Sequence, residues 1–168
     1  SRASYKLKEI LKNDIKPKKG CSILDLGSYP GGWSQVAIEF SSKSGLVVAI
    51  DIQPMEKIDG CFFLQKSVEA VTDEDFVSIK KFLPFDLVLS DMAPNISGIR
   101  ERDDALMLGL VDLVLMTIDT KLKKDGSALI KVFQGETLDY TREALNKRFN
   151  KVKISKPKAS MQNSKEIY

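Results

Sequence analysis

The sequence has no histidine among its 168 residues. Histidine is the side chain that most often acts as a general base near neutral pH, and it is the most common metal ligand in proteins. Its absence excludes Ser-His and Cys-His catalytic pairs and metal sites built on imidazole. We therefore expect chemistry that depends neither on imidazole nor on a bound metal.

Cysteine and long apolar runs are also scarce. Cys21 and Cys61 lie far apart in apolar, strand-like surroundings, which favours reduced core residues over a disulfide or a metal pair. The longest apolar stretch, 106–118, is interrupted by Gly109 and Asp112 and is shorter than the ~18 residues of a membrane span. With no visible secretory signal, these features predict a cytoplasmic protein without a membrane partner. The chain starts at Ser1 without a methionine, so we expect terminal residues to be missing from it.

The net charge of +3 is unevenly distributed along the chain. Residues 1–20 carry seven basic and two acidic side chains, a net of +5, and residues 146–168 carry seven basic and one acidic, a net of +6. The middle, 21–145, has a net of −8. If both ends lie on one side of the fold, they form a positive surface suited to a nucleic-acid backbone. The alternative is that these lysines only keep the protein soluble.

Apolar strand-like segments alternate with helical patterns along the whole chain, which predicts a single domain over 1–168. The expected strands are 21–26, 46–50, 61–64, 85–90, 127–133, 152–155 and 165–168. The expected helices are 1–13, 32–40, 72–82, 103–122 and 138–149. This order predicts an α/β fold with a doubly wound, mostly parallel sheet of seven strands and helices on both faces.

The most informative segment is ILDLGSYPGGWSQ at 23–35, where a buried strand runs into a glycine turn and a helix. In open α/β sheets such a loop binds adenine-containing cofactors. A dinucleotide loop requires the pattern G-x-G-x-x-G, but Tyr29 stands at its second glycine position, counted from Gly27. The loop therefore favours a ligand the size of a nucleoside.

Three further residues are candidates for the functional site, because each either follows the end of a predicted strand or lies buried within one. Asp51 follows the second strand, 24 residues after Gly27, where an acidic side chain normally accepts hydrogen bonds from ribose hydroxyls. Asp91 follows the fourth strand, in SDMAPNISG. Lys131 lies within the apolar strand 127–133, where a lysine is costly to bury without a partner or a function. The alternative for Lys131 is an edge strand on which it faces water.

Together these segments resemble the FtsJ/RrmJ family of S-adenosylmethionine-dependent RNA ribose 2′-O-methyltransferases, which have a Rossmann-like fold. The resemblance covers the whole chain. It rests on the segments SRASYKL (1–7), DLGSYPGGWSQ (25–35), DIQPM (51–55), SDMAPNISG (90–98), KVFQGE (131–136) and SKEIY (164–168). It implies methylation of RNA, with a uridine of large-subunit ribosomal RNA as the expected target and S-adenosylhomocysteine as the product.

The resemblance also assigns site residues. The catalytic tetrad of the family corresponds to Lys6, Asp91, Lys131 and Glu166. The residues expected to contact the cofactor are Gly27, Pro30, Gly31, Gly32, Trp33, Asp51, Ile52, Ser67 and Asp91. Two positions depart from the family. Tyr29 stands in SYP where AAP is common, and Ser67 stands where the family has an acidic residue near the adenine amino group.

Methyl transfer to a ribose hydroxyl requires the oxygen to be positioned and to lose its proton. Lys131 would either accept that proton or stay charged and orient the oxygen; Asp91 would hold Lys131, and Lys6 and Glu166 would position the ribose. The basic ends would bind RNA phosphates through Arg2, Lys8, Lys156 and Lys158. We expect a monomer.

Other functions remain open at this point. Transfer RNA or a messenger cap would be methylated by the same chemistry. A nicotinamide-dependent oxidoreductase is disfavoured by Tyr29 and by the absence of a Tyr-x-x-x-Lys motif or a histidine acid. A methyltransferase acting on nitrogen commonly has an Asn/Asp-Pro-Pro-aromatic turn, where this chain has DMAP. The last alternative is an RNA-binding module that has lost activity.

Overall fold

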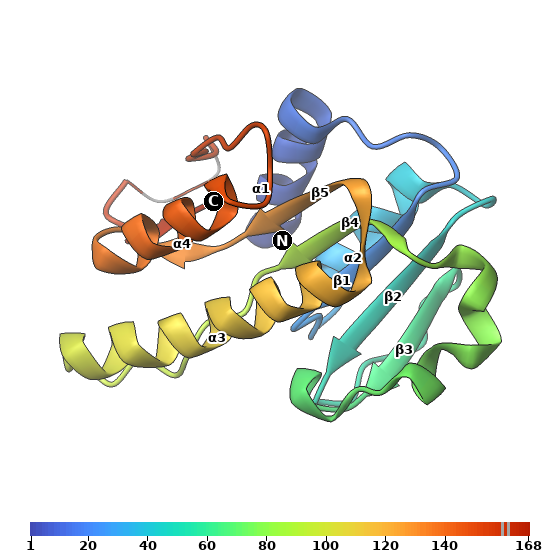
Figure 1. Ribbon diagram of the computed structural model, residues 1–168, viewed down its shortest axis with the longest axis horizontal. Helices are drawn as coiled ribbons and strands as arrows, with labels where there is room; N and C mark the ends of the chain where they lie inside the picture. Colours follow the sequence, from blue (N-terminus) through green and yellow to red (C-terminus); the bar gives the residue numbers. More distant parts are fainter. Residues whose placement is uncertain (159, 161) are drawn as a thin grey trace.

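The computed structural model describes residues 1–158, 160 and 162–168, and its centre is a parallel β-sheet (Figure 1). Within this part of the chain the sheet has five strands in the order β3-β2-β1-β4-β5. They are β1 (Ser22–Leu26), β2 (Leu46–Asp51), β3 (Cys61–Gln65), β4 (Phe85–Ser90) and β5 (Leu122–Ile130). All residues of β1 are buried, because helices cover both faces of the sheet.

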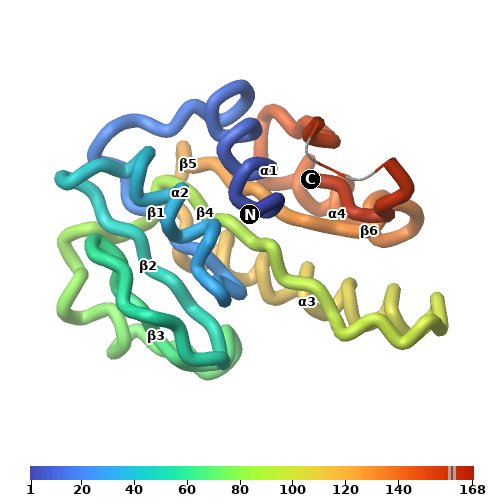
Figure 2. The backbone as a smooth tube through the Cα atoms, turned by 180° about the vertical axis from the view of Figure 1, so that it is seen from behind, coloured from blue at the N-terminus to red at the C-terminus, as the bar shows by residue number. Residues whose placement is uncertain are grey.

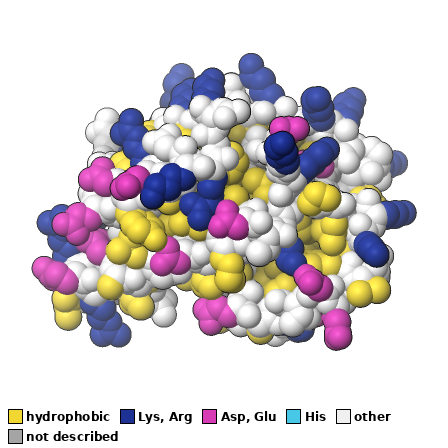
Figure 3. Space-filling view, in the orientation of Figure 1, with side chains coloured by type: hydrophobic (Ala, Val, Ile, Leu, Met, Phe, Trp, Pro, Cys, Tyr) yellow, Lys and Arg dark blue, Asp and Glu magenta, His cyan; other side chains and the backbone are white. Residues whose placement is uncertain are grey.

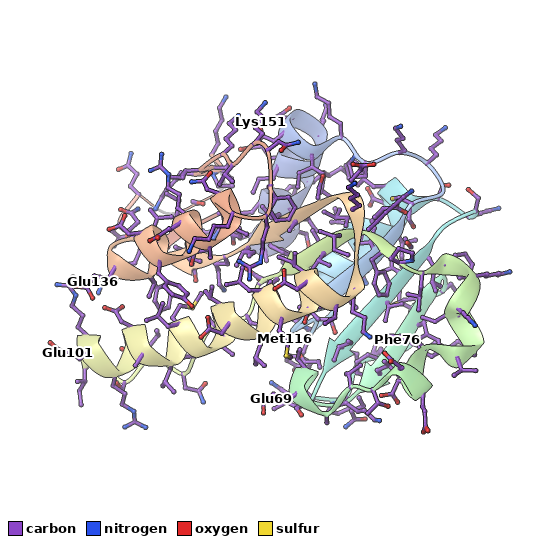
Figure 4. All side chains as sticks on the ribbon, in the orientation of Figure 1. Glu69, Phe76, Glu101, Met116, Glu136 and Lys151 are labelled. Atoms are coloured by element: carbon purple, nitrogen blue, oxygen red, sulfur yellow. The ribbon has the colours of Figure 1, made fainter. Side chains whose placement is uncertain are left out.

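The helices form one layer on each side of this sheet. On one face, α1 (Arg2–Ile10) packs against α2 (Gly32–Ser41); on the other, α3 (Arg100–Lys121) packs against α4 (Glu136–Asn146). Alternate strand residues face the two layers, as the period of two in a strand requires. Ile23 belongs to the apolar cluster that contains α1 and α2, and Leu24 belongs to the one that contains α3. Figure 4 labels Glu101 and Glu136, which show that α3 and α4 begin on the same side of the molecule.

Three short helical segments complete the chain: η1 (Leu11–Ile15), η2 (Val68–Ala70) and η3 (Asp73–Phe82). The expected helix 72–82 is a 3₁₀ segment with a kink at Ile79, and the Thr72–Asp75 capping box starts it. Phe76 of η3, labelled in Figure 4, packs edge-on against Phe85, with 6.0 Å between the ring centroids. Across the described residues, no helix combines the length and apolar character that a membrane span requires.

The expectation of one seven-stranded sheet is wrong. The last two strands, β6 (Val132–Phe133) and β7 (Glu166–Ile167), pair with each other in an antiparallel ladder, apart from the five-stranded sheet. Residues 152–155 do not form a strand, although Ser155 and Tyr168 exchange two backbone hydrogen bonds of 2.7 and 3.0 Å. A groove of about 440 Å³ separates this segment from β5, so it has no ladder along most of its length.

A break at Lys131 separates β5 from β6. The Lys131 N–H donates to the carbonyl of Ser90 at 2.9 Å, which keeps the backbone beside β4 while the chain leaves the sheet. The two ends of the chain meet near this break: Figure 2 shows α1 beside the C-terminal segment. Strands β1, β2, β4 and β5 all end at the same edge of the sheet, where parallel α/β folds bind their ligands.

Candidate active site

The glycine loop after β1 is held tightly against neighbouring backbone. Gly27 has φ +71°, and its N–H donates to the carbonyl of Ile50 at 2.9 Å. A Cβ at Gly27 would lie 2.4 Å from Cγ of Met92. Gly31 has φ +115°, a conformation that side-chain-bearing residues rarely adopt. The loop therefore presents bare backbone at the ligand-binding edge of the sheet.

Asp51 is fixed at the end of β2 and ties the glycine loop to it. Its Oδ2 accepts from the Tyr29 N–H at 2.9 Å, and its Oδ1 accepts from the Gln53 N–H at 2.8 Å. This is the position from which an acidic residue binds the ribose of an adenosine cofactor. Ile52 follows, with an exposed side chain, and Ser67 precedes η2 beyond the neighbouring strand β3.

Four charged side chains from distant parts of the chain converge at the same edge. Lys131 Nζ lies 3.3 Å from Asp91 Oδ1 and 3.6 Å from Glu166 Oε1. Lys6 Nζ lies 3.3 Å from the other oxygen of that carboxylate, Glu166 Oε2. The expected tetrad is thus assembled from α1, the end of β4, the break after β5, and β7, with Glu166 bridging the two lysines.

Both lysines of this cluster are largely buried, with side chains 9% exposed. A buried ammonium group is costly unless it is paired, and here each lysine has a carboxylate partner. Burial also raises the pKa of Asp91 above its usual value, although Lys131 and a hydrogen bond from Tyr168 favour its charged form. The cluster is therefore a low-dielectric site in which small changes in charge alter proton affinities.

Tyr168 belongs to this cluster, and the sequence reasoning missed it. Its hydroxyl donates to Asp91 Oδ1 at 3.2 Å, and its ring lies 5.8 Å from Lys6 Nζ and 5.9 Å from the ring of Trp33. Burial and the charges of Asp91 and Glu166 raise the pKa of the phenol, which keeps it protonated as a donor. The available signal was its spacing: Glu166 and Tyr168 are alternate residues, so they lie on one face of a strand.

Asp25 is a second residue that sequence reasoning missed. Its carboxyl group is fully buried in β1; Oδ2 accepts from Ser34 Oγ at 2.7 Å, whereas Oδ1 has no partner among the described residues. Burial, with a smaller contribution from the charges of Asp91 and Asp51, raises its pKa to about 7, although the hydrogen bond from Ser34 favours the charged form. The signal was an aspartate inside an apolar strand. Through Ser34, Asp25 links β1 to the first turns of α2, directly behind the glycine loop.

The remaining expected cofactor residues lie in or beside the loop. Trp33 is buried, and its Nε1–H donates to the carbonyl of Ala3 at 2.8 Å, which anchors α1 to the start of α2. Gly32 is the first residue of α2 and lies close to α1. A Cβ at this position would be only 2.7 Å from Ser4 Oγ, so any residue larger than glycine would displace the Ser4 side chain. Pro30 is exposed and follows a cis peptide bond.

The expected RNA-contacting residues differ in their surroundings. Arg2 is exposed at the start of α1, and Lys8 is exposed but pairs with Glu39 at 3.1 Å. Lys156 is exposed, but its Nζ donates to the carbonyls of Ser164 and Glu166, at 2.6 and 3.3 Å, so it is already engaged in holding the segment that contains β7. Lys158 is exposed. In the described ranges, no three Cys, Asp or Glu side chains are grouped closely enough to hold a metal ion.

Comparison with known proteins assigns the chain to a family. The model of the FtsJ-like methyltransferase family matches residues 1–168. Ribosomal RNA large subunit methyltransferase E of Xanthomonas campestris pv. campestris is 45% identical over 170 residues, covering all of this chain and 80% of the relative. The protein of the same name from Xanthomonas oryzae pv. oryzae is also 45% identical, with the same coverage.

Solved structures agree with this assignment. A crystal structure described as a ribosomal RNA methyltransferase of Plasmodium falciparum superposes with a TM-score of 0.86 at 27% identity, covering 99% of this chain and 93% of that one. Fibrillarin of Aeropyrum pernix, solved with bound S-adenosyl-L-methionine, has a TM-score of 0.58 at 14% identity, covering 86% and 63%, and supports the fold alone. The α/β architecture, the full-length family match and the close relatives agree: this chain belongs to the FtsJ-like methyltransferase family.

Proposed function

We propose that the protein transfers a methyl group from S-adenosylmethionine to the 2′-hydroxyl of a ribose in RNA, and that its target is a uridine of large-subunit ribosomal RNA. One observation carries the proposal: Lys6, Asp91, Lys131 and Glu166 meet beside the glycine loop, with contacts of 3.3–3.6 Å. The choice of ribosomal RNA follows the names of the relatives that are 45% identical.

The residues around the glycine loop fit S-adenosylmethionine. Gly27 and Gly31 give the loop the positive-φ backbone that its tight turn requires. Asp51, at the end of β2, lies where an acidic side chain accepts hydrogen bonds from ribose hydroxyls. Asp91, a member of the tetrad, follows β4 at the same edge of the sheet as this loop, so its carboxylate favours positive charge there. Pro30, Gly32, Trp33, Ile52 and Ser67 complete the proposed binding region. When bound, the cofactor supplies an electrophilic methyl group on a sulfonium centre.

The chain then has to position the hydroxyl and manage its proton. Lys131 is held between Asp91 and Glu166, and in our proposal its side-chain nitrogen faces the 2′-oxygen. In its neutral form the amine accepts the hydroxyl proton as the methyl group passes from sulfur to oxygen; in its charged form it orients the oxygen, and the proton leaves to solvent. Lys6 and Glu166 hold the ribose in line, which lowers the barrier by orientation. Two amines flanked by carboxylates suit an alcohol nucleophile better than a planar base nitrogen.

The direct test is transfer of a tritiated methyl group from S-adenosylmethionine to large ribosomal subunits. These should come from a bacterial strain that lacks its own FtsJ-like enzyme, so that the target is unmodified. The RNA is then digested to nucleosides and separated. We expect label in 2′-O-methyluridine. Label in a base, label only in transfer RNA or capped RNA, or binding without turnover would each overturn the proposal in a different way.

A further inference from the structure

Tyr5 is an exposed aromatic residue next to the buried tetrad. Its side chain is 69% exposed, while Lys6 and Leu7, the next residues of α1, are buried. The position of Tyr5 is fixed by the anchoring of this helix: Trp33 Nε1–H donates to Ala3 O at 2.8 Å, and Lys6 pairs with Glu166 at 3.3 Å. Consecutive residues of an α-helix project about 100° apart, so the ring lies on the exposed face of α1 that adjoins the face from which Lys6 enters the active site.

Basic residues surround Tyr5 at helical spacing. Arg2, Lys8 and Lys12 are all exposed, and with Tyr5 they form one stripe along α1 and η1, three to four residues apart. The acidic residue on this side, Glu9, accepts from the backbone N–H of Lys158 at 3.1 and 3.2 Å, which brings a further lysine to the same surface. Both side chains of the ion pair between Lys8 and Glu39 are more than half exposed, so the pair contributes little free energy. Lys8 can therefore leave Glu39 and bind an RNA phosphate instead.

This combination has a specific use in proteins that bind RNA. Single-stranded bases stack on exposed aromatic rings, while neighbouring Lys and Arg side chains follow the phosphates. A ribose hydroxyl cannot be methylated in line unless its nucleotide is held still, and a ring one residue from Lys6 can hold a base while the ribose lies at the tetrad. Figure 3 shows Lys and Arg side chains along the upper edge of the molecule, where the far end of the N-terminal helical segment and the C-terminal segment lie in Figure 1.

We propose that Tyr5 stacks on a nucleobase of the RNA substrate, at or next to the methylated nucleotide, and that the stripe of Arg2, Lys8 and Lys12 binds the adjoining phosphates. This inference rests on the proposed function and adds to it a residue that positions the substrate. It assigns to α1 a second role besides supplying Lys6.

The test compares Tyr5→Ala with Tyr5→Phe, which keeps the ring, and with Tyr140→Ala as a matched control. Tyr140 is 44% exposed and bonds to Asp112 of α3, on the opposite face of the sheet. Two quantities are measured for each variant: kcat/KM for the unmodified large subunits, and binding of a single-stranded oligoribonucleotide containing 2-aminopurine, whose fluorescence is quenched by stacking.

We expect Tyr5→Ala to lower kcat/KM for the RNA and the oligonucleotide affinity by about 5- to 100-fold, the range of one base–aromatic stack. The KM for S-adenosylmethionine should stay unchanged, and Tyr5→Phe and Tyr140→Ala should remain within about threefold of the unsubstituted protein. If Tyr5→Ala binds and methylates normally, or if Tyr5→Phe fails as badly as Tyr5→Ala, the stacking role is wrong.

The two proposals fail in distinguishable ways. Quenching that depends on Tyr5, without ribose methylation by the unsubstituted protein, would overturn the proposed function and keep the stacking role. Ribose methylation that does not depend on Tyr5 would do the reverse. Absence of RNA binding by the unsubstituted protein would overturn both.

Discussion

Lys131 is the residue whose chemistry can be tested most directly. We predict that Lys131→Ala lowers the single-turnover rate of methyl transfer by about 10²- to 10⁴-fold, the usual contribution of a positioned acid–base group. Binding of S-adenosylmethionine, followed by calorimetry, should change little, because the cofactor lies against the glycine loop in our proposal. A folded variant with a rate near that of the unsubstituted protein would remove Lys131 from the reaction.

Asp25 makes stability depend on pH in an unusual direction. Its pKa is about 7 in the folded protein and about 3.9 in an unfolded chain, so the folded state binds the extra proton between these values. The free energy of unfolding from this group should therefore fall as pH rises from about 4 to 7 and level off above 7. Across this pH range, the full pKa shift corresponds to a decrease in the free energy of unfolding on the order of 4 kcal/mol.

The matched variant is Asp25→Asn, which keeps the shape and cannot ionise. Urea unfolding of both proteins between pH 4 and 8 should show a smaller decrease for Asp25→Asn, with the gap widening toward pH 7. Parallel curves for the two proteins would show that the Asp25 carboxyl does not titrate in this window.

At the scale of elements, the glycine loop depends on a backbone conformation that only glycine adopts easily. We predict that Gly31→Ala, at φ +115°, destabilises the protein by about 1–2 kcal/mol and weakens binding of S-adenosylmethionine about tenfold. The added Cβ would also lie 3.0 Å from Ile58 Cδ1. Thermal unfolding and calorimetric titration with the cofactor provide the two measurements.

Gly109→Ala is the control for this substitution. Gly109 lies within α3, and a Cβ there would meet no atom within 4 Å apart from its chain neighbours and the backbone of its own helix. Alanine should therefore stabilise α3 by roughly 1 kcal/mol without changing cofactor binding. If both glycine variants bind the cofactor normally, the conformation at Gly31 is not required for the site.

The elements also show where sequence reasoning succeeds. Strands β1, β2 and β4 were predictable because each is mostly apolar along its length, as burial on both faces demands. The segment 152–155 alternates apolar and polar residues, which is also typical of a strand. A strand exists only where a partner supplies the ladder, and periodicity does not reveal partners. Lys131 was correctly identified as buried, yet it lies at a break between strands rather than inside one.

The site was predictable only in part, for a related reason. Short sequence patterns indicated the glycine loop and Asp51, because a turn rich in glycine and an acidic residue directly after a strand can each be recognised from neighbouring residues alone. Composition and periodicity could not bring Lys6 next to Glu166, which is 160 positions away; only the resemblance to a family did so. Tyr168 and Asp25 were missed, because their importance comes from burial and neighbours that only the fold creates.

At the scale of the whole molecule, the basic ends should make RNA binding strongly dependent on salt. Each phosphate contact releases counterions, so affinity should fall steeply between 50 and 200 mM salt. We predict that Arg2→Ala weakens binding and reduces the slope of log affinity against log salt by about one. Lys80→Ala, at an exposed lysine on η3, is the control and should leave the slope unchanged.

Fluorescence anisotropy of a labelled oligoribonucleotide over this salt range gives the slopes. A flat dependence for the unsubstituted protein would exclude phosphate contacts as the main source of affinity. Equal slopes for Arg2→Ala and the unsubstituted protein would place the RNA elsewhere on the surface.

The meeting of Lys6 with Glu166 has a consequence for how the protein is made. Translation produces α1 before β7, so the growing polypeptide contains Lys6 long before Glu166, its partner in the cluster. The sheet and the glycine loop can form earlier, but the lysine–carboxylate cluster is complete only after β7 has left the ribosome. The charged cluster is thus completed in one late step of synthesis. A product that terminates before β7 would contain the glycine loop but would lack Glu166, which pairs with Lys6.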